Sequence, residues 1–341
     1  MNSRQQHKRV LFYRRLKRFL AGTNGGNLKV RDYFDHVYHS DQYAPYIYFS
    51  EETIWHDNPG NVWQSLRAEA LPKWEVQDSD LLFFSGADWL VLNEADRRRP
   101  PAPVINIAQP RHTRPEDKRH AFLRYPAIRI AKSPRGADIL RAYGVNGPLF
   151  CIPDAIDLKS LPPIPANKDI DILILGLKQP ELARALEQRL QSLNRFRLRQ
   201  LNIVAQLPPK LPTRADFLRL LARAKIVACI PLSVAEGSEG FYLPALEGMA
   251  LECVVVCPHA VGNLDHCLHD YNCIVPEFTL DGLAAGVKTA LQLKAPKKRK
   301  LIQQGLDTVD KHRIEKERAA FLDLLHQAPE LWADKSLFLN S

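Results

Sequence analysis

The run Asp171-Ile-Leu-Ile-Leu175, which ends at Gly176, decides the fold class of this chain of 341 residues. Its apolar, β-branched composition predicts a buried strand, and a helix is expected to open near Pro180. The buried face of that helix is marked by leucines at helical spacing: Leu182, Leu186, Leu190 and Leu193. One strand–helix unit is therefore predicted here.

The same alternation continues toward the C-terminus. Further strands are predicted at Leu201–Val204, Lys225–Ile230, Cys253–Cys257 and Asn272–Val275, and further helices begin at Thr213, Pro244 and Leu280. Thr213 and Asp216 have the spacing of a capping box. The all-apolar run Cys253–Cys257 is typical of a strand covered on both faces in a parallel sheet. Repeated units of this kind predict a doubly wound α/β domain that binds ligands beyond the carboxyl ends of its strands.

The first half is predicted to form a second Rossmann-like unit. Its strands are expected at Val10–Tyr13, Tyr46–Phe49, Leu81–Phe84, Val104–Ile107, Ala127–Ala131 and Leu149–Ile152. The length suits two domains. We expect an N-terminal domain over residues 1–155, a proline-rich linker over 156–168 and a C-terminal domain over 169–341. The long helical stretch Arg299–Gln327 has no strand after it and is expected to cross back to the N-terminal domain.

Composition indicates a folded, soluble protein, with 45% hydrophobic and 25% charged residues. No apolar run reaches the roughly 20 residues that span a bilayer. The apolar stretch Val10–Tyr13 is too short for a secretory signal, so a cytoplasmic location is expected. The six cysteines are sparse, and several lie in strand-like runs, which favours buried reduced thiols.

The formal net charge of +9 is concentrated in basic runs. These runs are Arg14–Arg18, Arg97–Arg99, Arg111–Arg119 and Lys297–Lys300. Basic runs attract polyanions, which include nucleoside diphosphates, nucleic acid and the anionic face of a membrane. Charge alone leaves open which of these is the partner, or whether the runs are solvated surface.

The segment Glu239-Gly-Phe-Tyr-Leu-Pro-Ala-Leu-Glu247, followed by Gly248-Met-Ala250, carries the strongest functional signal. Pro244 suits the first position of a helix, which places Glu239 in the preceding loop and Glu247 in the helix. The start of a helix attracts phosphate, while carboxylates accept hydrogen bonds from sugar hydroxyls. This pairing predicts a nucleotide-sugar site.

The same segment resembles the two-glutamate motif of retaining GT-B glycosyltransferases, family 4 in particular. Further likenesses fall in the family's order. They are Ile152-Pro-Asp-Ala-Ile-Asp157 before the donor domain, Val261-Gly262-Asn-Leu-Asp265 and Asp270-Tyr-Asn272 after the motif, and Asn24-Gly25-Gly26-Asn27 near the start. The resemblance covers residues 150–295 well and residues 1–150 weakly. It implies a GT-B architecture, in which two Rossmann-like domains with parallel sheets face a central cleft.

The resemblance also implies roles for individual residues. Glu239 would support the charge that develops at the anomeric centre, and Glu247 would hold the ribose hydroxyls. The backbone amides of Gly240, Phe241, Tyr242 and Leu243 would bind the distal phosphate and sugar. Gly25 and Gly26 would face the cleft from the N-terminal domain. Family members transfer a sugar from a nucleoside diphosphate to a glycan or lipid-linked acceptor with retention, usually without a metal or other cofactor.

Several positions depart from the family pattern. Lys178 is the nearest base after the first strand of the donor domain, where the family often has an Arg and a Lys, and Arg184 lies one helical turn further on. The other departures are Asp154, Ala155, Val261 and Asp265. They leave the donor open and admit a weakened or lost activity. His112 follows a predicted strand and is expected to face the acceptor as a base or hydroxyl ligand, or else to be an ordinary loop histidine.

Three alternatives remain from the sequence. The first is zinc binding by Cys257, His259, His266, Cys267, His269 and Cys273, although no Cys-x-x-Cys pair is present. The second is an inactive transferase-fold protein that binds nucleic acid or serves as a scaffold. The third is a sugar-nucleotide epimerase or a phosphorylase. The leading hypothesis is a glycosyltransferase of surface-polysaccharide or glycolipid assembly, cytoplasmic or peripheral on the inner face of the membrane.

Overall fold

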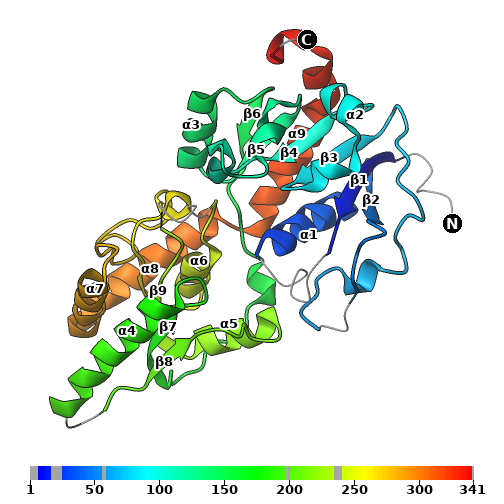
Figure 1. Ribbon diagram of the computed structural model, residues 1–341. Helices are drawn as coiled ribbons and strands as arrows, with labels where there is room; N and C mark the ends of the chain where they lie inside the picture. The colour runs from blue at the N-terminus through cyan, green and yellow to red at the C-terminus, as the bar shows by residue number, and fades with distance from the viewer. Residues whose placement is uncertain are drawn as a thin grey trace. The chain divides into compact units, whose positions relative to one another are not determined.

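The computed structural model describes residues 7–16, 25–55, 59–196, 198, 200–233 and 240–339 (Figure 1). The chain divides into two compact units. Unit 1 contains residues 1–153 and 317–341, and unit 2 contains residues 154–316. The proline-rich segment over 156–168 therefore lies within unit 2. Each unit is built on a parallel sheet.

Unit 1 has a six-stranded sheet of order β2-β1-β3-β4-β5-β6. Its strands are β1 (Lys8–Arg14), β2 (Tyr43–Phe49), β3 (Leu81–Ser85), β4 (Val104–Ile107), β5 (Ile128–Ala131) and β6 (Leu149–Cys151). All six strands predicted for this half are confirmed. Pro45 lies in β2. It is tolerated there because β2 is an edge strand, where a missing N–H breaks no ladder.

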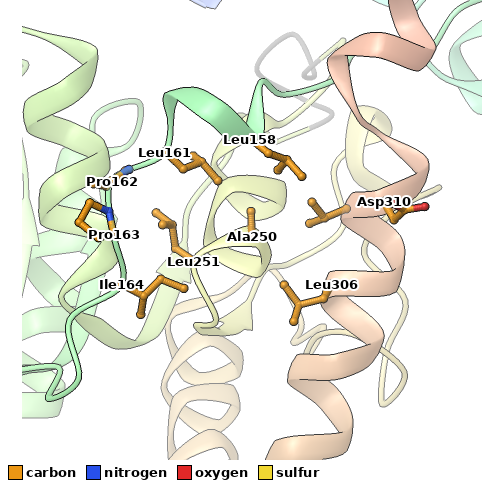
Figure 2. A pocket seen from close by; sticks show the side chains of 10 residues that line it. Leu158, Leu161, Pro162, Pro163, Ile164, Ala250, Leu251, Leu306 and Asp310 are labelled. Carbon is orange, nitrogen blue, oxygen red and sulfur yellow. The ribbon is translucent and has the colours of Figure 1, made fainter.

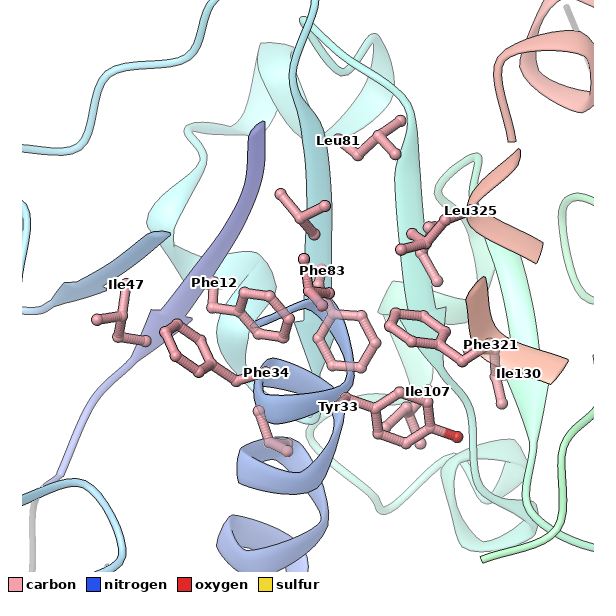
Figure 3. Close-up of a cluster of buried hydrophobic side chains, with 14 of the residues drawn as sticks. Phe12, Tyr33, Phe34, Ile47, Leu81, Phe83, Ile107, Ile130, Phe321 and Leu325 are labelled. Atoms are coloured by element: carbon pink, nitrogen blue, oxygen red, sulfur yellow. The ribbon is translucent and has the colours of Figure 1, made fainter. Parts of the chain in front are cut away.

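Helices α1 (Gly25–Tyr38) and α9 (Ile314–Ala333) contribute to one core of unit 1. Figure 3 shows the aromatic side chains at its centre. Phe321 of α9 packs edge-on against Tyr33 of α1, with ring centroids 4.7 Å apart, and lies 5.6 Å from Phe83 of β3. The described residues of this unit also form helices α2 (Glu94–Arg98) and α3 (Pro134–Tyr143). The C-terminal helix is thus an integral part of the first unit's core.

A buried ion-pair network also joins α9 to α1. Lys29 Nζ lies 2.7 Å from Glu317 Oε2 and 2.8 Å from Asp32 Oδ2, and His36 Nε2 lies 3.3 Å from Glu317 Oε1. The side chains of Lys29 and Glu317 are almost completely inaccessible to solvent. Burial alone would raise the pKa of Glu317, but Lys29 and His36 hold it below its ordinary value.

Unit 2 has a four-stranded sheet of order β10-β9-β7-β8. Its strands are β7 (Ile170–Leu175), β8 (Ile203–Gln206), β9 (Ala224–Cys229) and β10 (Val254–Val256), and its helices are α4 (Pro180–Gln191), α5 (Arg214–Ala222), α6 (Leu243–Ala250), α7 (Leu280–Gln292) and α8 (Ala295–Lys311). The predicted capping box is confirmed, because the Thr213 hydroxyl accepts from Asp216 N and the Asp216 carboxylate accepts from Thr213 N.

Two sequence predictions for this region are wrong. Residues 272–275 form no strand of the sheet, and Ile274 makes an isolated bridge to Val256. The Asn272 side chain instead anchors a turn, accepting from Leu268 N and donating to His266 O. The stretch predicted as one helix over 299–327 is broken into α8 and α9, because the chain between them pairs with Ile156.

Candidate functional site

The strand order of unit 2 reverses at β7, because β8 lies on one side of it and β9 on the other. In a doubly wound sheet, ligands bind beyond the carboxyl ends of the strands at such a switch point. The loop 176–179 follows β7, and a second loop, described at residues 230–233 and 240–242, follows β9. These two loops therefore define the candidate site of unit 2.

The loop after β9 leads into α6 through Gly240, Phe241 and Tyr242. Glu239, predicted to be catalytic, lies outside the described residues. Tyr242 is the N-cap residue of α6 and provides no side-chain cap, while Pro244 occupies the first turn. A helix that starts in this way can present its first N–H groups to an anionic ligand. The amides of residues 240–243, predicted to bind phosphate, lie at this helix start.

Glu247 lies one turn into α6, where its residue is only 1% exposed. Its carboxylate accepts a hydrogen bond from the Arg214 guanidinium at the start of α5. The next residue, Gly248, is needed for close packing of α6 on the sheet, because a Cβ there would lie 2.9 Å from Val227 Cγ1 of β9. The Glu247-Gly248 pair thus combines a polar role for the carboxylate with tight packing of the helix.

Lys210 connects this carboxylate electrostatically to two further cations. Burial lowers the pKa of Lys210, the positive charges of Arg214 and Lys178 lower it further, and Glu247 opposes them. Lys178 follows β7 and is exposed, Lys210 follows β8, and Arg214 is the first residue of α5. Arg214 and Lys210 thus interact with the buried Glu247 carboxylate, and Lys178 is close enough to Lys210 to lower its pKa. Three basic side chains at this edge outnumber the one carboxylate, a charge balance that suits a diphosphate.

Lys210 and Arg214 were missed by the sequence analysis. The capping box at Thr213 and Asp216 already located the start of α5 at the carboxyl end of the strand before it. Both residues could have been predicted from that position, because basic residues on either side of Thr213 lie at the ligand-binding edge of the same sheet. Arg184, one helical turn after Lys178, pairs with Glu181 at 2.5 Å.

An aromatic stack contacts the loop from within unit 2. The Phe241 ring stacks on the His266 imidazole, with centroids 4.4 Å apart and planes inclined by 22°. His312 contacts both rings, at 5.5 Å and 5.8 Å between centroids. The His312 Nδ1 lies 3.0 Å from the backbone oxygen of Asp154. The stack fixes Phe241, the second residue after Glu239.

The stack predicts a pH-dependent contribution to stability. Burial, followed by the neighbouring His312, lowers the pKa of His266 to about 3. The pKa of a histidine in the unfolded chain is about 6.5. Below that pH the unfolded chain binds a proton at His266 and the folded chain does not, so stability decreases as the pH is lowered. We expect His266→Phe to retain about 2 kcal/mol of the stability that the native chain loses between pH 7 and pH 5.

Urea unfolding of both proteins at pH 7, 6 and 5 measures this difference. His259→Phe serves as the control, because His259 is an exposed histidine of the same unit. Parallel pH dependence in the native chain and His266→Phe would contradict the assignment of a neutral buried imidazole.

The predicted acceptor-side residues lie in unit 1. Gly25 and Gly26 open α1 and are exposed, and a Cβ at Gly25 would meet nothing within 4 Å. His112 lies in the 3₁₀ turn η5 (Pro110–Thr113) and is 4% exposed. Burial, followed by Arg119 and Arg111, lowers the pKa of His112 to about 3. His112 is therefore a neutral, buried side chain.

The cysteines are all free thiols, as predicted, and all except Cys151 are buried. Over the residues that the structure describes, no group of three or more His, Cys, Asp or Glu side chains could hold a metal ion. Within those same ranges, no helix has the length and apolarity needed to cross a membrane.

A separate apolar cavity of about 640 Å³ lies near the far end of α6 (Figure 2). It is lined by Leu158, Leu161, Pro162, Pro163, Ile164, Ala250, Leu251, Leu306, Val309 and Asp310. Among the lining residues that the structure describes, Asp310 is the one that carries a charge. This lining suits neither a diphosphate nor a sugar, since it offers no cation and few hydrogen-bonding groups.

The whole chain is similar in structure to several solved glycosyltransferases. Sucrose-phosphate synthase from Thermosynechococcus elongatus matches with a TM-score of 0.68 at 12% identity, covering 96% of this chain and all of the other. HepE from Anabaena, solved with UDP and glucose, matches with a TM-score of 0.68 at 13% identity over 94% of this chain and all of the other. The UDP-forming trehalose-phosphate synthase from Burkholderia xenovorans matches with a TM-score of 0.58 at 11% identity over 95% and 99%.

The sequence matches no family model and no curated protein. The structural matches extend over both units, so the predicted α/β fold of the GT-B class, with two Rossmann-like units, is confirmed. That the two sheets face a central cleft stays a prediction.

Proposed function

We propose that the chain is a GT-B glycosyltransferase that transfers a sugar, with retention, from a nucleoside diphosphate sugar to a glycan or lipid-linked acceptor. The observation that carries this proposal is the cluster of Lys178, Lys210, Arg214 and Glu247 at the carboxyl edge of the unit 2 sheet. The solved complexes of HepE with UDP and with UDP-glucose support it, since that protein has a similar fold.

The chemistry that we assign to the site follows from these residues. Lys178, Lys210 and the start of α6 would neutralise the diphosphate, a role that a metal ion fills in other enzymes. Glu247, oriented by Arg214, would accept hydrogen bonds from the ribose hydroxyls. Glu239 would stabilise the positive charge at the anomeric carbon, and the departing phosphate would take the proton of the acceptor hydroxyl.

Calorimetric titration of the full chain with UDP, GDP and ADP tests the proposal and identifies the base. We expect one of the three to bind with a stoichiometry of one. Absence of binding to all three would contradict the proposed function, and binding of random RNA in their place, weakening steeply with salt, would favour the nucleic-acid alternative. For an active enzyme, the anomeric configuration of the product reports directly on retention.

The cation cluster gives a sharper prediction. Lys210→Gln is expected to weaken binding of the nucleoside diphosphate at least about 10-fold, because a charge-assisted hydrogen bond contributes about 1.5–3 kcal/mol. The measurement is the dissociation constant from the same titration. Arg219→Gln is the matched control, since Arg219 lies on the last turn of α5, is exposed and carries the same charge. Equal affinity of Lys210→Gln and Arg219→Gln would exclude the cluster as the phosphate site.

A further inference from the structure

Residues 240–242, which we call the α6 entry, lie against two histidine side chains of the same unit. Phe241 stacks on the His266 imidazole, with ring centroids 4.4 Å apart, and the His312 ring contacts both. His266 is 0% exposed. Burial and His312 lower the pKa of this imidazole, and the Tyr242 backbone, close to the ring, opposes them. His266 therefore lies against both residues that immediately precede α6.

Hydrogen bonds with two asparagines fix His266 in place. Its N–H donates to Asn263 O at 3.2 Å, and its carbonyl accepts from Asn272 Nδ2 at 2.9 Å. Both asparagines are buried and are themselves anchored. Asn263 Nδ2 donates to Pro258 O at 2.8 Å, and Asn272 Nδ2 donates to Thr308 Oγ1 at 2.8 Å. These bonds hold the His266 backbone beside the α6 entry.

A different segment of unit 2 fixes His312. Its Nδ1 lies 3.0 Å from Asp154 O, and its carbonyl accepts from Ile156 N at 3.0 Å. Ile314 N donates to Ile156 O at 3.0 Å, which completes the pairing of the two segments. The ring that contacts Phe241 and His266 is thus anchored through both its side chain and its backbone.

The position of the α6 entry matters for an anionic ligand. Tyr242 provides no side-chain cap, so the N–H groups at the start of α6 can be donated to a phosphate. A loop that is ordered only on binding lowers the affinity, because only the ordered fraction of the free protein is competent to bind. Contacts that order the entry in the free protein therefore raise the affinity without touching the ligand.

We propose that His266 and His312 are positioning residues for the nucleoside diphosphate sugar. They hold the Phe241 ring, and with it the N–H groups of residues 240–243, in the conformation that accepts the distal phosphate. Both histidines act through Phe241 and are assigned no contact with the donor. The inference rests on the proposed function for the identity of the ligand. The flat ring of His266, rather than its nitrogen atoms, is the feature on which Phe241 depends.

Calorimetric titration with UDP, GDP and ADP, together with steady-state transfer, tests the role of His266. His266→Ala is expected to weaken binding of the nucleotide that the native chain binds about 10-fold, because an aromatic pair can change an equilibrium by up to about that factor. KM for the nucleotide sugar should rise equally, with kcat within about twofold of the native value. His266→Phe keeps a flat ring and is expected to restore the affinity to within about threefold.

A double-mutant cycle tests whether His266 acts through Phe241. Phe241→Leu is expected to weaken nucleotide binding about 10-fold, and adding His266→Ala to it should change the affinity less than about twofold further. Leu283→Ala is the control for lost stability alone, since Leu283 is fully buried in the core that α7 forms with the sheet. It should unfold at a lower urea concentration and bind the nucleotide with native affinity.

Amide hydrogen exchange of the unliganded chain measures the position of the α6 entry without any ligand. Residues 240–243 are expected to exchange faster in His266→Ala than in the native chain, whereas His266→Phe should exchange at close to the native rate. Unchanged exchange in His266→Ala would show that the imidazole does not order the entry.

Four binding results would overturn the proposal: native affinity in His266→Ala, an equal loss in Leu283→Ala, no recovery in His266→Phe, or additive losses in the double variant. Where the native chain binds a nucleotide, each of these results refutes only this inference and leaves the proposed function standing. A native chain that binds none of the three nucleotides contradicts the proposed function, and the ligand named here with it.

Discussion

Replacing Glu239 by glutamine is expected to lower kcat for sugar transfer by about 100- to 1000-fold, the usual loss when one group that stabilises transition-state charge is removed. In the proposed mechanism the carboxylate would act on a positive charge that exists only as the donor bond breaks, so affinity for the nucleoside diphosphate should change little. Release of the nucleoside diphosphate from the nucleotide-sugar, followed at steady state, measures the effect.

Glu236→Gln is the matched control, since Glu236 lies three residues before Glu239 and the substitution is chemically the same. Its kcat is expected to stay within about twofold of the native value. An unchanged kcat in Glu239→Gln, or an equal loss in Glu236→Gln, would remove Glu239 from the reaction.

The largest effect on stability is expected at the ion pair between α1 and α9. Lys29→Met removes the lysine cation that pairs with the buried Glu317 carboxylate and leaves His36 beside it, which costs about 3–5 kcal/mol. Without Lys29, its attraction no longer offsets the free energy of removing the Glu317 charge from water. Urea unfolding at pH 7, followed by fluorescence and circular dichroism, measures the loss.

The double variant Lys29→Met/Glu317→Leu is expected to recover much of the stability, because it removes both charges together. Lys316→Met is the control, since Lys316 pairs with Asp310 at the exposed surface, where an ion pair contributes at most about 1 kcal/mol. Equal destabilisation by Lys29→Met and Lys316→Met would show that the network contributes no more than a surface pair.

The fold could be predicted largely from short apolar runs. Strand β10, with every residue buried, is apolar throughout, and β4 and the Ile170–Leu175 strand are apolar except for Asn106 and Asp171, as expected of strands covered on both faces. Local patterns do not report pairing between distant segments. The break between α8 and α9 depends on hydrogen bonds between Ile156 and the residues around Arg313, which a helical periodicity cannot reveal.

The candidate site was also predictable only where it depends on local sequence. The helix start after Tyr242 followed from Pro244 and the glutamate spacing. Arg214 lies 33 residues before Glu247 in the sequence, and Lys210 lies further away still. No local motif therefore links either residue to the carboxylate. The roles of Glu239, Gly25 and Gly26 stay predictions from the sequence.

Amide hydrogen exchange with and without saturating UDP, GDP or ADP tests whether a nucleoside diphosphate binds at the carboxyl edge of the unit 2 sheet. We expect slower exchange in residues 176–179, 207–214 and 240–247, with little change around the apolar cavity that Leu158 and Leu306 line. Nucleotide binding that protects other segments and leaves these three unchanged would contradict it.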